Sequence, residues 1–325
     1  MKATYRDFEL RTLFGDFFPA GLTMSGFDQP TAAVPPVDGT YVFSASPTRE
    51  ILMFLDEPDQ SALFLSGPTG SGKTSGIMQV AARLNWPVTS VTCRSRLEFS
   101  DLVGHHTLVS PAPGESPVMK FQYGPLAKAM AFGHILILNE VDLCDPGELS
   151  GLNDVLEGRP LVIETNGGQI IKPHEKFRVV VTGNSCGNGD ESGFYAGVQT
   201  QNLAAMDRYR TVLVDYPQPE VEETILAKVC PELGVLAPLM VQFANKIRAC
   251  FKGETPEQRL SVTLSTRKIV QWAKLARRYQ GASCPLKESL ELLLMNRCAP
   301  AERFAIDTMG KIIFNDGWKT DAENA

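Results

Sequence analysis

Eight consecutive residues, 67–74, have the residue types and spacing of a phosphate-binding loop. After the apolar run 63–65, the chain reads Gly67, Pro68, Thr69, Gly70, Ser71, Gly72, Lys73, Thr74. In this G-x-x-x-x-G-K-T pattern the glycines let backbone N–H groups turn toward phosphate oxygens. Lys73 can reach the outer phosphates, and the Thr74 hydroxyl can take one place on Mg²⁺. The stretch therefore predicts nucleotide binding, whereas a simple Gly-rich turn would leave Lys73 and Thr74 unexplained.

A second apolar run, 135–138, ends in the polar pair Asn139-Glu140. In nucleotide hydrolases such a run usually ends in Asp-Glu, where the Asp orders water on Mg²⁺ and the Glu polarises the attacking water. Asn139 keeps an oxygen acceptor but no charge, so we expect it to hold Mg²⁺ through water, with Thr74, less firmly. We expect the turn after the strand to aim Asp142 elsewhere. The alternative for Glu140 is a solvated carboxylate at a strand end.

Asn184 ends another apolar run, 177–183. An Asn at this place in a nucleotide-binding sheet can hold the water that faces the γ-phosphate. The alternative is a turn former, which is the commoner role of Asn at a strand end.

Arg208 closes a stretch, 200–209, that reads as a helix with Leu203 and Met206 facing inward. A guanidinium there could stabilise transition-state charge in a neighbouring subunit, and such arginine fingers contribute roughly 10³ to 10⁵ in rate. Arg210 is a rival for this role, and a surface ion pair between Arg208 and Asp207 is the structural alternative.

Arg267 falls in the first turn of a helix predicted from residue 266, where Ser265 or Thr266 is the cap. A cation is disfavoured there by the helix dipole. A nucleotide phosphate opposite Arg267 would compensate.

The elements that must position these residues follow from hydrophobic periodicity. Between residues 46 and 218, apolar strands alternate with helices, which predicts an α/β fold with a mostly parallel five-stranded sheet covered on both faces. The expected strands are 62–65, 88–92, 135–138, 179–182 and 211–214. Two helices should bury one face each. Their inward residues are Ile51, Leu52 and Leu55 in the first and Ile77, Val80, Ala81 and Leu84 in the second.

Three segments are expected along the chain. Residues 1–45 read as an extended N-terminal arm, 46–218 as the nucleotide-binding core, and 219–325, after Pro217 and Pro219, as an all-α lid. Two inserts interrupt the core, 101–122 and 161–171. The second has Asn166-Gly167 between β-rich runs, which is a strong hairpin signal. Both inserts are candidates for contact with a partner or substrate.

Composition narrows the class of protein. With 325 residues, 43% hydrophobic and 21% charged, the chain is globular. A net charge of −6 argues against broad binding to nucleic acid or anionic membranes, so Lys274, Arg277 and Arg278 read as a solvated helix face. Seven scattered cysteines without C-x-x-C suit a reducing cytoplasm. The start shows no apolar signal core and no stretch reaches transmembrane length. The histidines 105, 106 and 174 have no third ligand at useful spacing for a metal.

Taken in order, these residues resemble an AAA+ ATPase: Walker A at 67–74, Walker B at 135–140, sensor 1 at Asn184, arginine finger at Arg208 and sensor 2 at Arg267. Longer passages are similar to the MoxR-like group and, within it, to the ATPase subunit of aerobic cobaltochelatases. These passages are 34–43, 79–87, 101–104, 187–195, 201–208 and 265–273.

The resemblance implies a homo-oligomeric ring, commonly a hexamer, with ATP and Mg²⁺ between subunits. It also implies a partner with a von Willebrand factor A domain that couples ATP hydrolysis to a client protein complex. Asn139 departs from the family pattern, which leaves open a nucleotide-gated scaffold with little turnover. A P-loop kinase is a third class, but it would leave Arg208, Arg267 and the C-terminal helices without a role.

Overall fold

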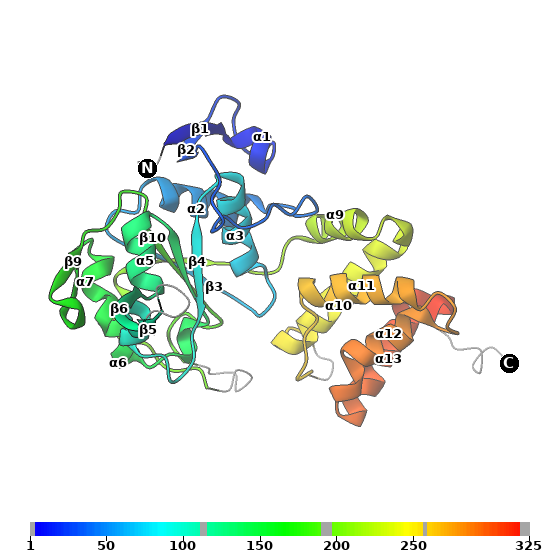
Figure 1. The fold of residues 1–325 in the computed structure, drawn as a ribbon. Coiled ribbons are helices and arrows are strands. Elements are labelled where there is room, and N and C mark those ends of the chain that lie inside the picture. Colours follow the sequence, from blue (N-terminus) through cyan, green and yellow to red (C-terminus); the bar gives the residue numbers. More distant parts are fainter. Residues whose placement is uncertain (1–3, 111–115, 190–196, 256–258, 319–325) are drawn as a thin grey trace. The chain divides into compact units, whose positions relative to one another are not determined.

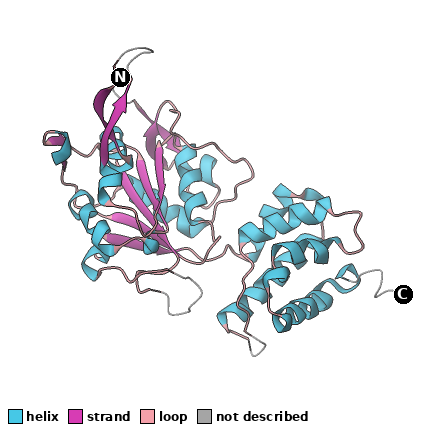
Figure 2. Ribbon diagram, turned by 60° about the horizontal axis from the view of Figure 1, so that its bottom comes forward, coloured by secondary structure: helices cyan, strands magenta, loops and turns pink. Residues whose placement is uncertain are grey.

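The computed structural model describes residues 4–110, 116–189, 197–255 and 259–318. The chain divides into two compact units. The first comprises residues 1–38, 45–68 and 73–214, and the second comprises 39–44, 69–72 and 215–325. Figure 1 labels helices and strands along the chain. Figure 2 shows that the strands lie in the first unit, whereas helices occur in both. The domain limits expected at residues 45 and 218 stay predictions.

The first unit is built on a five-stranded sheet in which every neighbouring pair is parallel. The five predicted strands are confirmed, with ends that differ by no more than a residue or two. In spatial order they are β11 (Tyr209–Leu213), β3 (Ala62–Ser66), β10 (Arg178–Gly183), β7 (Ile135–Asn139) and β4 (Val88–Thr92). The three central strands are almost wholly buried, whereas β4 and β11 are partly exposed because they form the edges.

Helices cover both faces of this sheet, which is why its central strands read as continuous apolar runs. Alternate residues of β3, β7 and β10 join one core cluster with α5 (Pro125–Phe132), while the residues between them are buried on the opposite face. Figure 1 shows α3 (Lys73–Arg83) and α5 on opposite sides of the sheet. The inward faces predicted for α2 (Ala45–Asp56) and α3 are confirmed, since all seven named residues are buried.

Both predicted inserts contain hairpins. The first consists of α4 (Phe99–Val103) followed by the antiparallel pair β5 (Gly104–Val109) and β6 (Val118–Tyr123). Its residues 111–115 lie outside the described residues. The second pairs β8 (Leu161–Ile163) with β9 (Gln169–Ile171), and Gly167 has a φ of 66° at the turn. The short helices α6 (Pro146–Leu149) and α7 (Asn153–Leu156) precede it.

The N-terminal segment is more structured than the extended arm expected from the sequence. Strands β1 (Tyr5–Glu9) and β2 (Thr23–Phe27) pair antiparallel, and α1 (Leu10–Phe14) lies between them. The hairpin packs closely on the chain after α3, where the Phe27 N–H donates to the Leu84 carbonyl. A Cβ at Gly26 would overlap that carbonyl, so glycine permits the close approach.

The helix predicted over 200–209 is shorter than expected, and the inward face assigned to Leu203 is wrong. Helix α8 spans only Leu203–Met206, because Tyr209 already belongs to β11. Asn202 caps it by accepting the Ala204 N–H. With a single turn, the buried residue is Ala205, and the Leu203 side chain is 85% exposed.

Among its described residues, the second unit contains helices and connecting segments but no strand. Its helices are α9 (Pro219–Val229), α10 (Leu236–Lys252), α11 (Thr266–Arg278), α12 (Pro285–Leu293) and α13 (Pro300–Phe314). Aromatic rings of Phe243, Trp272, Phe314 and Trp318 meet in its core. A buried ion pair joins Arg248 of α10 to Glu222 of α9, at 2.7 Å. Within the described residues, no helix is both long and apolar enough to cross a membrane.

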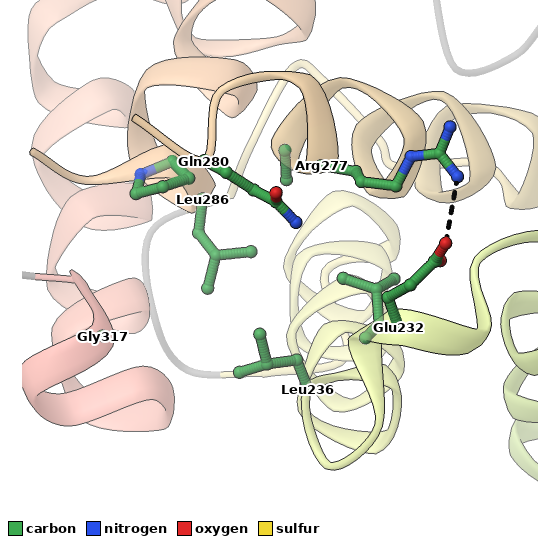
Figure 3. Close-up of a pocket in the computed structure, with 9 residues that line it drawn as sticks. Glu232, Leu236, Arg277, Gln280, Leu286 and Gly317 are labelled. Carbon is green, nitrogen blue, oxygen red and sulfur yellow. Dashed lines mark hydrogen bonds and ion pairs between the residues drawn. The ribbon is translucent and has the colours of Figure 1, made fainter. Parts of the chain in front are cut away.

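A cavity of about 270 Å³ opens among the helices of this unit (Figure 3). Apolar side chains including Leu236 and Leu286 line it, and the Arg277 guanidinium meets the Glu232 carboxylate at 3.3 Å beside it. Arg277, read from the sequence as part of a solvated helix face, is thus also a lining residue of this cavity.

Candidate functional site

The candidate site lies at the carboxyl edge of the parallel sheet, where β3, β7 and β10 all end. Parallel strands bring these ends together, so residues far apart in sequence become neighbours. Gly67 follows β3 with a φ of 155°, and its N–H donates to the Gly183 carbonyl at 3.3 Å. A Cβ on Gly67 would overlap the carbonyl oxygen of Val214, so only glycine fits. The loop is therefore held close to two neighbouring strands.

Lys73 begins α3, and its ammonium group lies inside the loop. Its Nζ donates to the carbonyls of Gly67 at 2.6 Å and Pro68 at 3.0 Å, and to Asn184 Oδ1 at 3.3 Å. The sequence-predicted phosphate ligand and the sequence-predicted sensor 1 are thus brought together. Phosphate oxygens near the start of α3 would compete for this ammonium and would meet the favourable end of the helix dipole.

Asn139 Oδ1 accepts a hydrogen bond from the Thr74 hydroxyl at 2.7 Å, so the two residues predicted to hold Mg²⁺ are neighbours. Its amide is oriented by its own donors, since Nδ2 donates to Ser90 Oγ at 2.8 Å and to the Val91 carbonyl at 3.4 Å. The amide oxygen therefore faces Thr74. The neutral side chain at position 139 is accommodated by the neighbouring edge strand β4.

Glu140 lies directly after β7 in a left-handed conformation, with a φ of 56°. Its backbone N–H donates to Thr182 Oγ1 at 3.2 Å, and that hydroxyl lies 3.4 Å from Asn139 Oδ1. Thr182 is only 2% exposed, whereas the Glu140 side chain is exposed. A buried hydroxyl thus fixes the backbone while the carboxylate stays accessible to water and substrate.

Asp142 is aimed away from Thr74, as expected, but its role was missed by the sequence analysis. The side chain is fully buried, and Oδ2 accepts the backbone N–H groups of Asn184 at 2.7 Å and Ser185 at 3.2 Å. A carboxylate two residues after Glu140 was the signal available in the sequence. Its target could not be inferred without knowing that β7 and β10 are neighbours.

Arg208 is paired within the first unit, and its carboxylate partner is Glu157 rather than Asp207. Its Nη2 lies 2.5 Å from Glu157 Oε1, and Nη1 donates to the Ala204 carbonyl. The hydrogen bond from Arg208 lowers the pKa of the Glu157 carboxyl below its usual value. The rival candidate, Arg210, forms an ion pair with Asp59.

Arg267 lies in the second unit, at the start of α11, with its side chain exposed. The predicted cap is confirmed: Ser265 Oγ accepts the Lys268 N–H at 3.3 Å. Residues 69–72 of the loop belong to this unit as well, and the Tyr216 hydroxyl donates to the Thr69 carbonyl at 3.2 Å. A Cβ at Gly70 would meet the Ser265 side chain.

The histidines and cysteines have other surroundings. His106 packs against the Phe121 ring, and His174 Nδ1 accepts the Lys176 N–H at 3.1 Å. No group of three potential metal-ligating side chains occurs among the residues that the structure describes. All seven cysteines are free thiols, and a hydrogen bond from Cys93 lowers the pKa of the Cys144 thiol behind the Walker B strand.

The residues at this site are suited to bind Mg²⁺ and a nucleoside triphosphate. Gly67 leaves backbone where a side chain would intrude, Lys73 supplies the ammonium group, and α3 begins at that lysine. Thr74 and Asn139 place two oxygens 2.7 Å apart, and oxygen donors are what Mg²⁺ prefers. Both are neutral, so water and phosphate would complete the set.

Two family models match this chain. Residues 62–196 match the AAA domain (dynein-related subfamily), and residues 222–297 match the CbbQ/NirQ/NorQ C-terminal domain. The passage 187–195, part of the resemblance noted above, lies mostly outside the described residues, from 190 onward. A putative ATPase from Cytophaga hutchinsonii aligns over 83% of this chain and 81% of its own, with 15% identity and a TM-score of 0.44.

Two curated relatives are similar in sequence. The aerobic cobaltochelatase subunit CobS of Sinorhizobium sp. is 30% identical over 301 residues, covering 90% of this chain and 86% of its own. An uncharacterized protein of Staphylococcus aureus strain USA300 is 30% identical over 206 residues, covering 62% of this chain and 73% of its own. With its Walker motifs at one sheet edge and these matches over both units, the chain belongs to the MoxR-like group of AAA+ ATPases, the group that includes the cobaltochelatase subunit.

Proposed function

We propose that this chain is the ATP-hydrolysing motor subunit of a MoxR-like, cobaltochelatase-like complex. The observation that carries the proposal is the hydrogen-bonded convergence of Lys73 with Asn184 and of Thr74 with Asn139 at the sheet edge. These pairs unite Walker A, Walker B and sensor 1, three parts that ATP hydrolysis requires at one place.

Each residue has a distinct task in this proposal. Lys73 binds the outer phosphates, Glu140 accepts a proton from the attacking water, and Asn184 orients that water. Thr74 and, through water, Asn139 would hold Mg²⁺, which would neutralise charge on the phosphates. The exposed carboxylate of Glu140, on a backbone fixed by Thr182, suits a general base that must meet water.

Phosphate release tests the catalytic assignment. The Glu140→Gln variant should still bind ATP but release phosphate at least about a hundredfold more slowly, the size of a general-base contribution. Glu57→Gln is the matched control, since Glu57 is an exposed carboxylate after α2. Equal phosphate release from the wild-type chain and from Glu140→Gln would remove Glu140 from catalysis.

A scaffold with little turnover is the second candidate, and the environment of Asn139 favours it. The Asn139 amide donates to Ser90 Oγ and to the Val91 carbonyl, so its neutral side chain is held in place without the charge that would bind Mg²⁺ firmly. A scaffold predicts ATP-dependent assembly with negligible turnover, and a sharp rise in turnover for Asn139→Asp. Brisk phosphate release by the natural sequence would exclude it.

In the proposed homo-oligomeric ring, Arg208 would be the finger that reaches a neighbouring subunit's γ-phosphate, and Arg267 would sense the nucleotide. In this role the Arg208 guanidinium must leave the Glu157 carboxylate and bind the phosphate, which is also an anion. Mixing inactive Arg208→Ala with inactive Lys73→Ala should restore part of the activity, because mixed interfaces combine an intact loop with an intact finger. No recovery on mixing would argue against a shared site. The same experiment with Arg210→Ala discriminates between the two arginines.

The proposed partner contains a von Willebrand factor A domain, and the proposed client is a protein complex that the ring remodels. The support is the relationship to the cobaltochelatase subunit over 90% of this chain. Co-purification of the chain with such a partner, retained in ATP and weakened after hydrolysis, would support the assignment. A partner that binds equally with and without nucleotide would oppose it.

A further inference from the structure

Asp142 is a charged residue without any solvent exposure, in the 3₁₀ turn η1 (Val141–Leu143) that follows the Walker B strand. Its Oδ2 accepts the N–H groups of Asn184 and Ser185, the two residues that follow β10. Both N–H groups thus meet a carboxylate oxygen, an acceptor that can form stronger hydrogen bonds than a backbone carbonyl does. The carboxylate therefore acts as a clamp on the backbone of sensor 1.

Two neighbouring residues, Gly183 and Gln199, leave room for the Asp142 carboxylate and hold its turn. Gly183 precedes Asn184, and a Cβ there would lie 3.3 Å from Asp142 Oδ2 and 2.9 Å from the Phe64 ring. The Asp142 backbone carbonyl accepts the Gln199 N–H at 2.8 Å, which holds the turn from its other side. Both the room for the carboxylate and the position of its turn are thus determined by the packing of three chain segments.

The other oxygen, Oδ1, is buried and has no hydrogen-bond partner among the described residues. An unsatisfied buried acceptor destabilises the folded state, and more so when it is charged. A side chain that only filled this space would avoid that cost, since an apolar residue of similar shape would be more stable. A buried polar group that lowers stability in this way is often retained because it has a function.

We propose that Asp142 is a positioning residue for ATP hydrolysis, acting through Asn184. By fixing the Asn184 and Ser185 peptides, it presents the Asn184 side chain to Lys73 Nζ, 3.3 Å away. It also couples the turn that carries Glu140 to sensor 1, so the two move as one unit. The inference rests on the proposed function, because the role of Asn184 is part of that proposal.

The test is a double-mutant cycle in phosphate release with the full chain. Asp142→Ala should lower kcat by about 10- to 100-fold, the effect of misplacing a catalytic group by about 1 Å. The ATP dissociation constant should change less than about twofold, because Lys73 and the loop are untouched. The Asp142→Ala/Asn184→Ala double variant should be no slower than Asn184→Ala alone. Losses that multiply, or an unchanged kcat in Asp142→Ala, would overturn the proposal.

Two further variants separate positioning from folding. Asp142→Asn keeps an oxygen for both N–H groups and places its NH₂ where Oδ1 has no partner, so most of kcat should return. Asp145→Ala, three residues further along the chain, removes the side chain that caps α6 and should leave kcat unchanged. If Asp142→Asn were as slow as Asp142→Ala, the hydrogen bonds would not be the cause.

Amide hydrogen exchange distinguishes this inference from the proposed function itself. In the wild-type chain the Asn184 and Ser185 amides should be protected, and in Asp142→Ala they should exchange at least about tenfold faster. This measurement needs no turnover. Protection that persists in Asp142→Ala overturns the positioning role, whereas absent wild-type hydrolysis with lost protection would reject only the motor.

Discussion

The two ends of the parallel sheet use polar side chains in opposite ways. At the amino ends of the strands, Arg178 is 7% exposed and donates to the carbonyls of Leu55, Glu175 and Phe177. At the carboxyl ends, Glu140 is exposed and the Lys73 ammonium lies among loop carbonyls that phosphate could replace. The amino end satisfies the charge of Arg178 internally, whereas the carboxyl end keeps the charges of Lys73 and Glu140 accessible to a ligand.

Trp86 is at the centre of the amino end. Its ring is fully buried, its Nε1 donates to the Gly133 and Lys176 carbonyls, and the cations of Lys176 and Arg178 lie over it at 5.3 and 5.6 Å. Burial lowers the pKa of Arg178 to about 10. The N-terminal hairpin contributes the Phe27 ring, 6.0 Å from the indole. This end anchors the fold, while the opposite end holds the proposed nucleotide site.

The largest effect should come from removing the anchor. Trp86→Ala should lower the free energy of unfolding by about 3–5 kcal/mol, because it leaves a cavity and unpaired carbonyls. Denaturant titration measures this loss. The molecules that stay folded should bind ATP as the wild-type chain does. Phe132→Ala at the same end is the control, since its side chain is 57% exposed and should matter by less than about 0.5 kcal/mol. A selective loss of ATP affinity in Trp86→Ala would break the comparison.

At the amino end, His134 should make the stability of the fold depend on pH. Burial, with Lys128 and His174 nearby, lowers the pKa of His134 to about 4. Above pH 6.5 the histidine is neutral in both states, so it contributes no pH dependence there. Between pH 6.5 and 4, His134 is protonated in the unfolded chain but neutral in the folded chain. The free energy of unfolding therefore falls by up to about 3 kcal/mol as the pH is lowered through this range.

The check on His134 is a set of unfolding curves at several pH values. His134→Gln should flatten the dependence between pH 6.5 and 4, whereas His105→Gln, at an exposed position, should leave it unchanged. If the His134→Gln and wild-type slopes agreed, the buried neutral histidine would not be the cause.

The smallest expected change in stability comes from a hydroxyl at the carboxyl end, and this change should also lower turnover. Thr182→Val removes the acceptor of the Glu140 N–H and should cost about 1 kcal/mol. Its kcat should fall by about tenfold or more, because the Glu140 backbone loses its fixed position. Thr89→Val is the matched control, since Thr89 pairs with His134 at the amino end. Equal kcat losses in both variants would show that the two ends are not distinct.

Local patterns predicted most of the fold. The five strands and the inward faces of α2 and α3 were recoverable because apolar periodicity reflects contacts with a single core. The one-turn helix α8 was misjudged, since nothing in its sequence shows that β11 begins at Tyr209. The N-terminal hairpin was missed because β1 is largely exposed and lacks a clear alternation.

The candidate groups of the site could be identified from the sequence alone. The loop 67–74, Glu140 and Asn184 each belong to a short motif, and a short motif needs no knowledge of the fold. The residues that these groups contact depend on the tertiary structure. Asp142 meets Asn184 across 42 residues, and Arg208 meets Glu157 across 51. Ser90 orients Asn139 from the edge strand. Such pairs depend on which strands become neighbours, and that order follows from packing the whole sheet rather than from any local pattern.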